Sequence, residues 1–383
     1  MKCLMGDEMT RLLAVFARLG AAAAPLALAS PGLAQGPVPS SVPLLEAPGG
    51  GPVLGRLRIF DDWAVGCDNQ LSCEAVALVP EGAGQSYMAL VVLQRAGGGA
   101  GAGTIRLLGA EQLRGQIELM VDNRRLARIK AEHDMVEITG PAALETMRAL
   151  ASNYAFELRA GKKLIDAPSL SGLPAALRYM DEVQGRVGSV AALVATGEEP
   201  AERARPVPAA PVMAAFVAVG ADASPPVFTP QEQAAARRLA VCDGLHDSDY
   251  PPEIHRLDTD HALLLLPCQA GEYNVSAVPL IATATTATAA GAGGWTFRIA
   301  RFDHVPGASG DPDAPPLIVN ARWNPSRAEL SSFAKGRALG DCGAAETYKW
   351  DGSRFRLVEA RSMPVCRGAW EWPVLYSAGT AGE

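Results

Sequence analysis

The densest group of side chains that could do chemistry lies in one short stretch of the chain. Three histidines and five carboxylates fall within sixteen consecutive positions: His246, Asp247, Asp249, Glu253, His255, Asp258, Asp260 and His261. Imidazole and carboxylate groups can bind zinc or calcium. The spacing, however, matches neither His-Glu-x-x-His nor a calcium loop of alternating acidic ligands. Pro251 and Pro252 indicate a surface loop. We therefore predict no bound metal and no cofactor, and we keep only three weak candidate ligands: His246, His255 and His261.

A covalent catalyst is not predicted either. The reactive serine of the commonest hydrolase fold stands in a Gly-x-Ser-x-Gly string, which does not occur in this chain. A nucleophilic cysteine must remain unpaired, whereas the cysteines of this chain are expected to pair. We therefore name no catalytic residue. The alternative that stays open is a hydrolase or metal-dependent enzyme that uses the loop 246–261.

Two smaller groups of charged residues could contact a partner. One group stands at the end of a predicted helix that Gly185 would terminate, and the other lies at a Gly-Asp-Cys-Gly turn, 340–343. Charged side chains beside glycines can hold a ligand, but they can equally form ion pairs that stabilise the helix end and the turn. We keep five candidate interaction residues: Asp181, Glu182, Arg186, Arg337 and Asp341.

The first 34 residues have the features of a secretory leader. Arg11 and Arg18 precede an apolar region that runs from Leu19 to Ala29, and small residues up to Ala34 offer a cleavage site. The eleven residues of that run are too few to cross about 30 Å of hydrocarbon. We therefore predict a signal peptide over 1–34 and no transmembrane segment after its cleavage.

Cleavage would remove Cys3 and leave six of the seven cysteines. An even number in an exported chain favours disulfides. A zinc site would require short Cys-x-x-Cys spacings, which are absent. The cysteines fall into three couples that are local in sequence, and we predict these bonds: Cys67 with Cys73, Cys242 with Cys268, and Cys342 with Cys366. In the loop-entropy description the three bonds contribute at most about 9 kcal/mol together.

A proline-rich segment divides the chain into two regions, which must position the candidate residues named above. Residues 198–230 carry seven prolines among alanine and valine, a composition typical of an extended tether. We predict a flexible leader over 35–55, an N-terminal β-rich domain with helices over 56–197, a linker over 198–230 and a C-terminal β-rich domain over 231–383. The predicted fold class is α+β, mainly β, with two or three helices covering the first domain and disulfides cross-linking the chain.

Hydrophobic periodicity predicts the elements within each domain. In the first domain we expect a hairpin around Trp63 and Cys67, followed by strands near 87–93, 104–108, 116–121 and 124–129. The expected helices begin at Pro141 and end at Gly161, begin at 171–174 and end at Gly185, and span 189–196. In the second domain we expect strands over 261–268, 273–281, 295–302, 317–320, 346–350 and 354–359. The last two strands flank Asp351-Gly352, a strong hairpin signal.

Composition and charge exclude several classes of protein. Apolar residues make up 49% and charged residues 20% of the 383 positions, which suits a globular chain rather than a disordered one or a coiled coil. The 34 basic residues are outnumbered by 41 acidic residues, and the formal net charge is −7. A sequence-independent nucleic-acid binder places many cations against phosphates. We therefore predict no nucleic-acid partner.

Several strings in the chain resemble a known family. They are FDDWAVGCDN (60–69), SLSGLPAALRYMDEVQGRVG (169–188), CQAGEYN (268–274), GDCG (340–343), and YKWDG with a later CRG (348–368). Together they resemble the exported proteobacterial family called domain of unknown function 1176, over nearly the whole mature chain. Ala338 stands where the family pattern has glycine. The first half is also similar to invasion-associated locus B proteins, which share the aromatic-Asp-Trp hairpin and a Ser-Leu-x-Gly helix start.

The resemblance implies a periplasmic or secreted location and no established activity. Combined with the predicted disulfides and the absence of a catalytic motif, it leads us to expect a non-catalytic binding or interaction protein of the cell envelope. The expected partner is an envelope macromolecule or a small ligand whose identity the sequence does not give.

Overall fold

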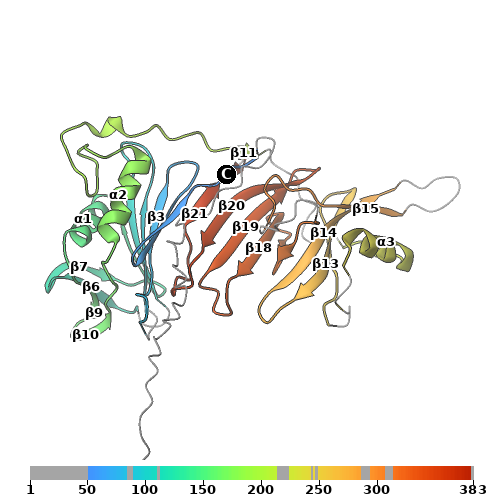
Figure 1. Ribbon diagram of the computed structural model, residues 1–383, viewed down its shortest axis with the longest axis horizontal. Coiled ribbons are helices and arrows are strands. Elements are labelled where there is room, and N and C mark those ends of the chain that lie inside the picture. Colours follow the sequence, from blue (N-terminus) through green and yellow to red (C-terminus); the bar gives the residue numbers. More distant parts are fainter. Residues whose placement is uncertain are drawn as a thin grey trace, which may run out of the picture. The chain divides into compact units, whose positions relative to one another are not determined.

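The computed structural model describes residues 51–380 except for 84–88, 110–112, 214–223, 243–244, 246–248, 286–293 and 307–313 (Figure 1). The predicted signal peptide and His246 lie outside the described residues. The described chain is mainly β, with several sheets and three α-helices. The fold class predicted from the sequence is thereby confirmed.

The first half of the chain forms two antiparallel sheets. The six-stranded sheet has the order β1-β2-β3-β4-β5-β8: β1 (Leu57–Phe60), β2 (Trp63–Cys67), β3 (Cys73–Ala77), β4 (Leu90–Arg95), β5 (Gly103–Leu108) and β8 (Met135–Thr139). The four-stranded sheet has the order β10-β9-β6-β7: β6 (Gln116–Val121), β7 (Arg124–Lys130), β9 (Phe156–Ala160) and β10 (Lys163–Asp166). The predicted strands over 104–108, 116–121 and 124–129 are therefore confirmed.

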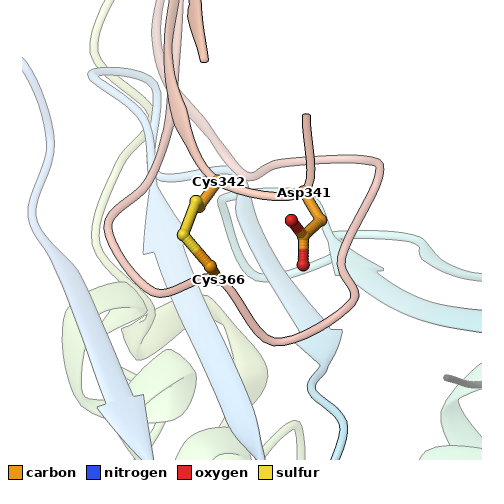
Figure 2. Close-up of side chains that lie close together, drawn as sticks. All are labelled: Asp341, Cys342 and Cys366. Carbon is orange, nitrogen blue, oxygen red and sulfur yellow. A yellow bond between two sulfur atoms is a disulfide. The ribbon is translucent and has the colours of Figure 1, made fainter. Parts of the chain in front are cut away.

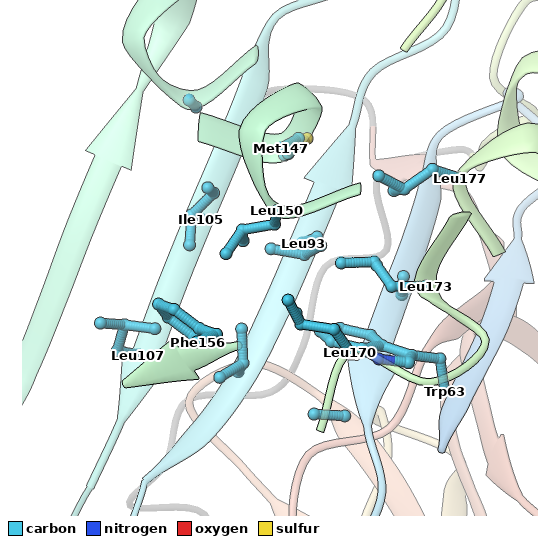
Figure 3. Packing of buried hydrophobic residues seen from close by; sticks show 14 of the residues in the cluster. Trp63, Leu93, Ile105, Leu107, Met147, Leu150, Phe156, Leu170, Leu173 and Leu177 are labelled. Carbon is cyan, nitrogen blue, oxygen red and sulfur yellow. The ribbon is translucent and has the colours of Figure 1, made fainter. Parts of the chain in front are cut away.

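Two helices cover one face of the six-stranded sheet. They are α1 (Gly140–Ala151) and α2 (Leu173–Gln184). Figure 3 shows the core between them, where Met147 and Leu150 of α1 lie next to Leu93 and Ile105 of the sheet, and Leu173 lies near Trp63. Each of these side chains is at most 1% exposed. Burying a side chain of this size stabilises the folded state by about 1.5 to 3 kcal/mol.

The first predicted helix is shorter in the structure than in the sequence analysis. Ser152 and Asn153 follow α1 directly, and their side chains donate hydrogen bonds to the carbonyl oxygens of Arg148 and Ala149, at 2.8 and 2.6 Å. These bonds end the helix. Phe156 and Leu158, which fall within the expected helix, belong instead to strand β9, and Gly161 lies in the turn that follows, with φ of 59°.

The predicted helix over 189–196 is wrong, because this segment forms turns. The backbone N–H groups of Leu193 and Val194 donate to the carboxylate of Asp181, at 2.8 and 3.0 Å. A buried carboxylate thus takes donors that a helix would have used within its own turns. The end of α2 at Gly185 is as predicted, since Gly185 has φ of 69°.

The second half of the chain also forms two sheets. One has the order β12-β13-β14-β15, with β16 paired to β14: β12 (Glu253–Arg256), β13 (His261–Ala270), β14 (Val275–Ala284), β15 (Trp295–Ile299) and β16 (Ile318–Val319). The other has the order β17-β18-β19-β20-β21: β17 (Arg322–Asn324), β18 (Glu329–Lys335), β19 (Gly343–Trp350), β20 (Phe355–Met363) and β21 (Val374–Ser377). Trp350 pairs with Phe355 across the Asp351-Gly352 turn, which confirms the predicted hairpin.

Short elements complete the second half. Helix α3 (Pro230–Ala240) begins with a capping box formed by Thr229 and Glu232, and its buried alanines join the core of the sheet that contains β13 and β14. Strand β11 (Val212–Met213) pairs in parallel with β22 (Gly379–Thr380), and a 3₁₀ turn spans Ala201–Arg203. Among the described residues, no helix has the length and apolar character needed to cross a membrane.

Both faces of strand β4 are buried, as its continuous apolar sequence predicts. Val91 and Leu93 belong to the core beneath the helices. Leu90 and Val92 on the other face belong to a separate core that contains Met363 and Trp372 from the end of the chain. The final strands therefore help to bury the first sheet. The division into two domains at 198–230 stays a prediction.

All three predicted cysteine pairs are joined. The structure bonds Cys67 to Cys73, Cys242 to Cys268 and Cys342 to Cys366. Cys67 and Cys73 lie directly opposite each other in the β2–β3 pairing. The pairing derived from the even count and the local spacing is thereby confirmed.

Candidate functional site

Four of the family-like strings meet in one polar network, although up to 306 residues separate the residues in contact. Arg367, from the Cys-Arg-Gly string, is at its centre. Its side chain donates to the carbonyl oxygens of Val79 and Asp61, at 2.8 and 2.7 Å, and forms an ion pair with the carboxylate of Asp62. The Arg367 and Asp62 side chains are only 14% and 13% exposed. A mostly buried ion pair of this kind fixes the loop after β20 against the turn between β1 and β2.

The Ser-Leu-Ser-Gly string joins the same network. Ser169 donates from its hydroxyl to the second carboxylate oxygen of Asp62 at 2.6 Å, and its carbonyl oxygen accepts a hydrogen bond from the Trp63 indole at 3.0 Å. Gly172 has φ of 83°, and a Cβ there would collide with the carbonyl of Phe60. This close approach explains why the string before α2 requires glycine.

The Gly-Asp-Cys-Gly string completes the network. The guanidinium of Arg337 donates to Asp341 at 2.6 Å, and the Gly368 N–H donates to the other oxygen of the same carboxylate at 2.7 Å. Figure 2 shows this carboxylate beside the Cys342–Cys366 disulfide. We call Asp62, Ser169, Arg337, Asp341 and Arg367 the motif junction. Its bonds hold the loops that the disulfide connects.

The alanine at 338 fits the turn that Arg337 begins. The Gly340 N–H donates to the Arg337 carbonyl at 2.9 Å, and the left-handed residue of this turn is Gly340, with φ of 67°. Ala338 is not among the described residues with positive φ. The departure from the family pattern at this position therefore causes no backbone strain.

Asp341 is also the centre of a group of metal-type ligands. In the described part of the chain, Asp341, Cys342 and Cys366 are the one set whose ligand atoms lie within 4.8 Å of one another. The two sulfur atoms are bonded to each other, and the carboxylate already accepts hydrogen bonds from Arg337 and Gly368. A thiolate is the form of cysteine that binds a metal. With the disulfide formed, this group is therefore a structural cross-link.

Asp341 predicts a specific acid sensitivity. Hydrogen bonding to Arg337 holds the pKa of Asp341 below its usual value, although partial burial acts in the opposite direction. A carboxyl group with a lowered folded-state pKa contributes stability above its unfolded pKa of about 3.9 and loses it as the pH falls through the folded value. We expect the unfolding midpoint of the wild type to decrease more steeply between about pH 5 and pH 2 than that of Asp341→Asn. Urea unfolding at several pH values measures this difference, and parallel pH profiles would contradict it.

Two of the three candidate residues at the end of α2 lie inside the protein. Asp181 and Arg186 are both 0% exposed. Arg186 donates to the carbonyl oxygen of Ala96 at 2.8 Å and also contacts Gly98 and Gln184. These contacts connect the helix end to the glycine-rich loop 96–102 between β4 and β5. Glu182 is exposed and pairs with Arg178 one turn away, at 3.1 Å.

Burial perturbs the ionisation of this cluster. Loss of hydration lowers the pKa of Arg186 to about 10, although Asp181 opposes the shift. Arg95 is 2% exposed, and burial together with the nearby Arg186 lowers its pKa to about 10 as well. Burial also raises the pKa of Asp181. The negative charge of Asp181 therefore offsets only part of the cost of burying these two guanidinium groups.

Within the described residues, loop 246–261 does not bring its candidate ligands His255 and His261 together in one site. His255 contacts Glu253 at 3.2 Å. His261 contacts Asp258 at 2.9 Å, and the other oxygen of Asp258 accepts from the Trp350 indole at 3.0 Å. Burial would raise the pKa of Asp258, but the bonds from Trp350, Asp260 and His261 together hold it below its usual value. These contacts anchor the start of β13 to the hairpin of β19 and β20.

A pocket of about 250 Å³ lies between β11 and strands β19 to β21. Its lining includes Val212, Asp303, Asp351, Arg356 and Tyr376. Asp303 accepts from the Leu357 N–H at 2.8 Å and pairs with Arg356 at 3.2 Å. Burial nevertheless raises the pKa of Asp303. The pocket therefore offers charges of both signs beside an apolar wall.

Sequence reasoning did not single out the residues at the centre of these sites. Asp62 and Arg367 stood within the FDDW and CRG strings but were not named as candidates. Asp303 and Arg356 carried no motif at all. The available signal for Asp62 and Arg367 was that both belong to strings typical of the family.

The fold and the site define a mainly β protein, cross-linked by three disulfides, whose sequence motifs meet in one polar network. The chain belongs to the family described as "Protein of unknown function (DUF1176)", which matches residues 57–379. It is also similar to the "Uncharacterized protein YpfG" of Escherichia coli (strain K12), with 29% identity over 343 residues that cover 83% of this chain and 92% of the relative. No solved structure matches the chain significantly. The predicted family is confirmed, while the similarity to invasion-associated locus B proteins stays a prediction.

Proposed function

We propose that this protein is exported to the bacterial periplasm, or secreted, and acts by binding a partner of the cell envelope. The observation that carries the proposal is the complete pairing of the six described cysteines between sequence neighbours. Disulfides of this kind persist in oxidising compartments and are rare in the cytosol. The leader-like sequence over 1–34 supports the same location.

Binding rather than catalysis is supported by how the charged residues are used. Asp62, Asp341 and Arg367 are committed to the motif junction, and Asp258 is committed to His261 and Trp350. Such contacts fix loops in place, as a recognition surface requires. The proposed likeness of the first half to invasion-associated locus B proteins agrees with an envelope role, and the pocket beside β11 is a candidate site for a small ligand of mixed charge.

Cell fractionation combined with thiol labelling tests the proposed location. Cells expressing the full chain are opened by osmotic shock, and free thiols are alkylated before mass spectrometry. We expect the protein in the periplasmic fraction or the medium, shortened after Ala34, with none of the six cysteines labelled. Six labelled cysteines, or an intact leader in the cytosol, would overturn the proposal.

Metal analysis distinguishes the proposed binding role from the alternative, a metal-dependent enzyme that uses loop 246–261. We expect the dialysed protein to carry no stoichiometric zinc or calcium, and partners crosslinked in the periplasm to be the same for wild type and for His255→Ala with His261→Ala. Retained metal that this double variant loses would contradict the binding role and favour an enzyme.

A further inference from the structure

The four-stranded sheet, whose strands are labelled in Figure 1, presents one face to the core and the other to solvent. In β6, Ile117, Leu119 and Val121 are buried, whereas the alternate residues Glu118 and Met120 point to the other face. Strands β7 and β9 pair with β6 on either side. The outward residues of the three strands therefore form one continuous surface.

This outward surface is rich in cations. In the strand register, Glu118 lies opposite Arg128 of β7 and Arg159 of β9, and Gln116 lies opposite Lys130. We call the following outward residues the basic face: Glu118, Arg125, Arg128, Lys130, Glu157 and Arg159. Four cations and two carboxylates give this face a net positive charge in a chain whose total is −7.

Both carboxylates of the basic face are already paired. Glu118 contacts Arg125 at 3.0 Å and Arg128 at 3.8 Å, and Glu157 contacts Arg159 at 2.6 Å. Within the part of the chain that the structure describes, Lys130 has no ion-pair partner. The Arg125 and Arg128 side chains are 57% and 58% exposed. The cations are thus accessible and outnumber their local counter-charges.

The edges of the same sheet add cations and apolar groups. Arg124, Lys162 and Lys163 are exposed at the strand ends and, among the described residues, form no ion pair. Leu164 of β10 lies opposite Arg159 and is 48% exposed. Tyr154 is 95% exposed, and its N–H donates to Asp122 in the β6–β7 turn at 3.2 Å. Tyrosine side chains are enriched where a protein surface meets the lipid interface.

We propose that the basic face binds the surface of a membrane that contains anionic phospholipid. A sheet of four strands is about 14 Å across and about 20 Å long. An open surface of this kind suits a bilayer, whereas a single polymer chain is better bound in a groove. Cations near an anionic surface each strengthen binding by about fivefold. The negative charge of the rest of the chain would orient this face toward the lipid.

Vesicle cosedimentation tests the proposal with the purified protein. We expect binding to vesicles of phosphatidylcholine with about one third phosphatidylglycerol, little binding to pure phosphatidylcholine, and weaker binding as salt increases. The double variant Arg128→Gln with Lys130→Gln should lose about 25-fold in affinity, at about fivefold for each cation removed. Any contribution from a retained leader is the same in the wild type and in every variant, so the comparison between variants removes it.

A matched control removes the same charge from elsewhere. Arg238→Gln with Arg322→Gln changes two exposed arginines of α3 and β17, and it should bind anionic vesicles like the wild type. Equal binding to both kinds of vesicle, equal losses in the two double variants, or binding to heparin without binding to vesicles would each overturn the proposal. This inference gives the proposed envelope role a partner, but the vesicle result can fail while the location and thiol results stand.

Discussion

Replacing Arg367 with alanine is expected to lower the free energy of unfolding by about 3 to 5 kcal/mol. A loss of this size is typical when one partner of a buried ion pair is removed. The substitution leaves the Asp62 carboxylate without its cation in a site where that side chain is only 13% exposed. It also removes donors from the carbonyl oxygens of Asp61 and Val79. Urea unfolding followed by tryptophan fluorescence measures the effect.

An exposed ion pair provides the control for this experiment. Arg178 pairs with Glu182 on the surface of α2, and both side chains are more than half exposed. Arg178→Ala should therefore cost only about 0.3 to 0.5 kcal/mol. The double variant Asp62→Asn with Arg367→Ala should lose less than the sum of its single variants, because the two residues act as a unit. A loss below about 1 kcal/mol for Arg367→Ala would show that the motif junction contributes little to stability.

Removing the disulfide between Cys342 and Cys366 is expected to cost about 3.5 kcal/mol, because the bond closes a loop of 24 residues in the unfolded chain. Removing the bond between Cys67 and Cys73, which closes a loop of 6 residues, should cost about 2.2 kcal/mol. Paired cysteine-to-alanine variants, compared by urea unfolding without reductant, measure both values.

Reduction of the wild type supplies an independent comparison. Treatment with excess reductant should make the wild type at least as unstable as the Cys342→Ala with Cys366→Ala variant. A variant as stable as the wild type, or a larger loss from the shorter loop, would contradict the loop-entropy explanation.

Local patterns allowed much of the β-structure to be predicted. Strands β5, β6 and β7 lie where alternation placed them, and Asp351-Gly352 joins β19 to β20 as its turn chemistry requires. The cysteine pairs were predictable for the same reason, since every bond joins neighbours in sequence. In each case the deciding interaction acts between residues that are close along the chain.

Contacts between distant segments could not be predicted in this way. The partner of Asp62 is 305 residues away, and no periodicity connects the two. The incorrect helix over 189–196 has a shorter-range origin, because the carboxylate of Asp181 on α2 takes the N–H groups of Leu193 and Val194, 12 and 13 residues later. The candidate residues Asp181 and Arg186 looked like surface charges, but both are buried. Arg186 donates to the carbonyl oxygen of Ala96, which is 90 residues away, and Asp181 accepts from backbone N–H groups beyond the end of its helix.

The order of the disulfides along the chain bears on how the protein matures. Counted without Cys3, the first cysteine is bonded to the second, the third to the fourth and the fifth to the sixth. If cysteines are oxidised in the order in which they emerge from the translocation channel, every pair formed is already the native one. An oxidase alone is then sufficient for assembly, and no isomerase is needed to rearrange mispaired thiols.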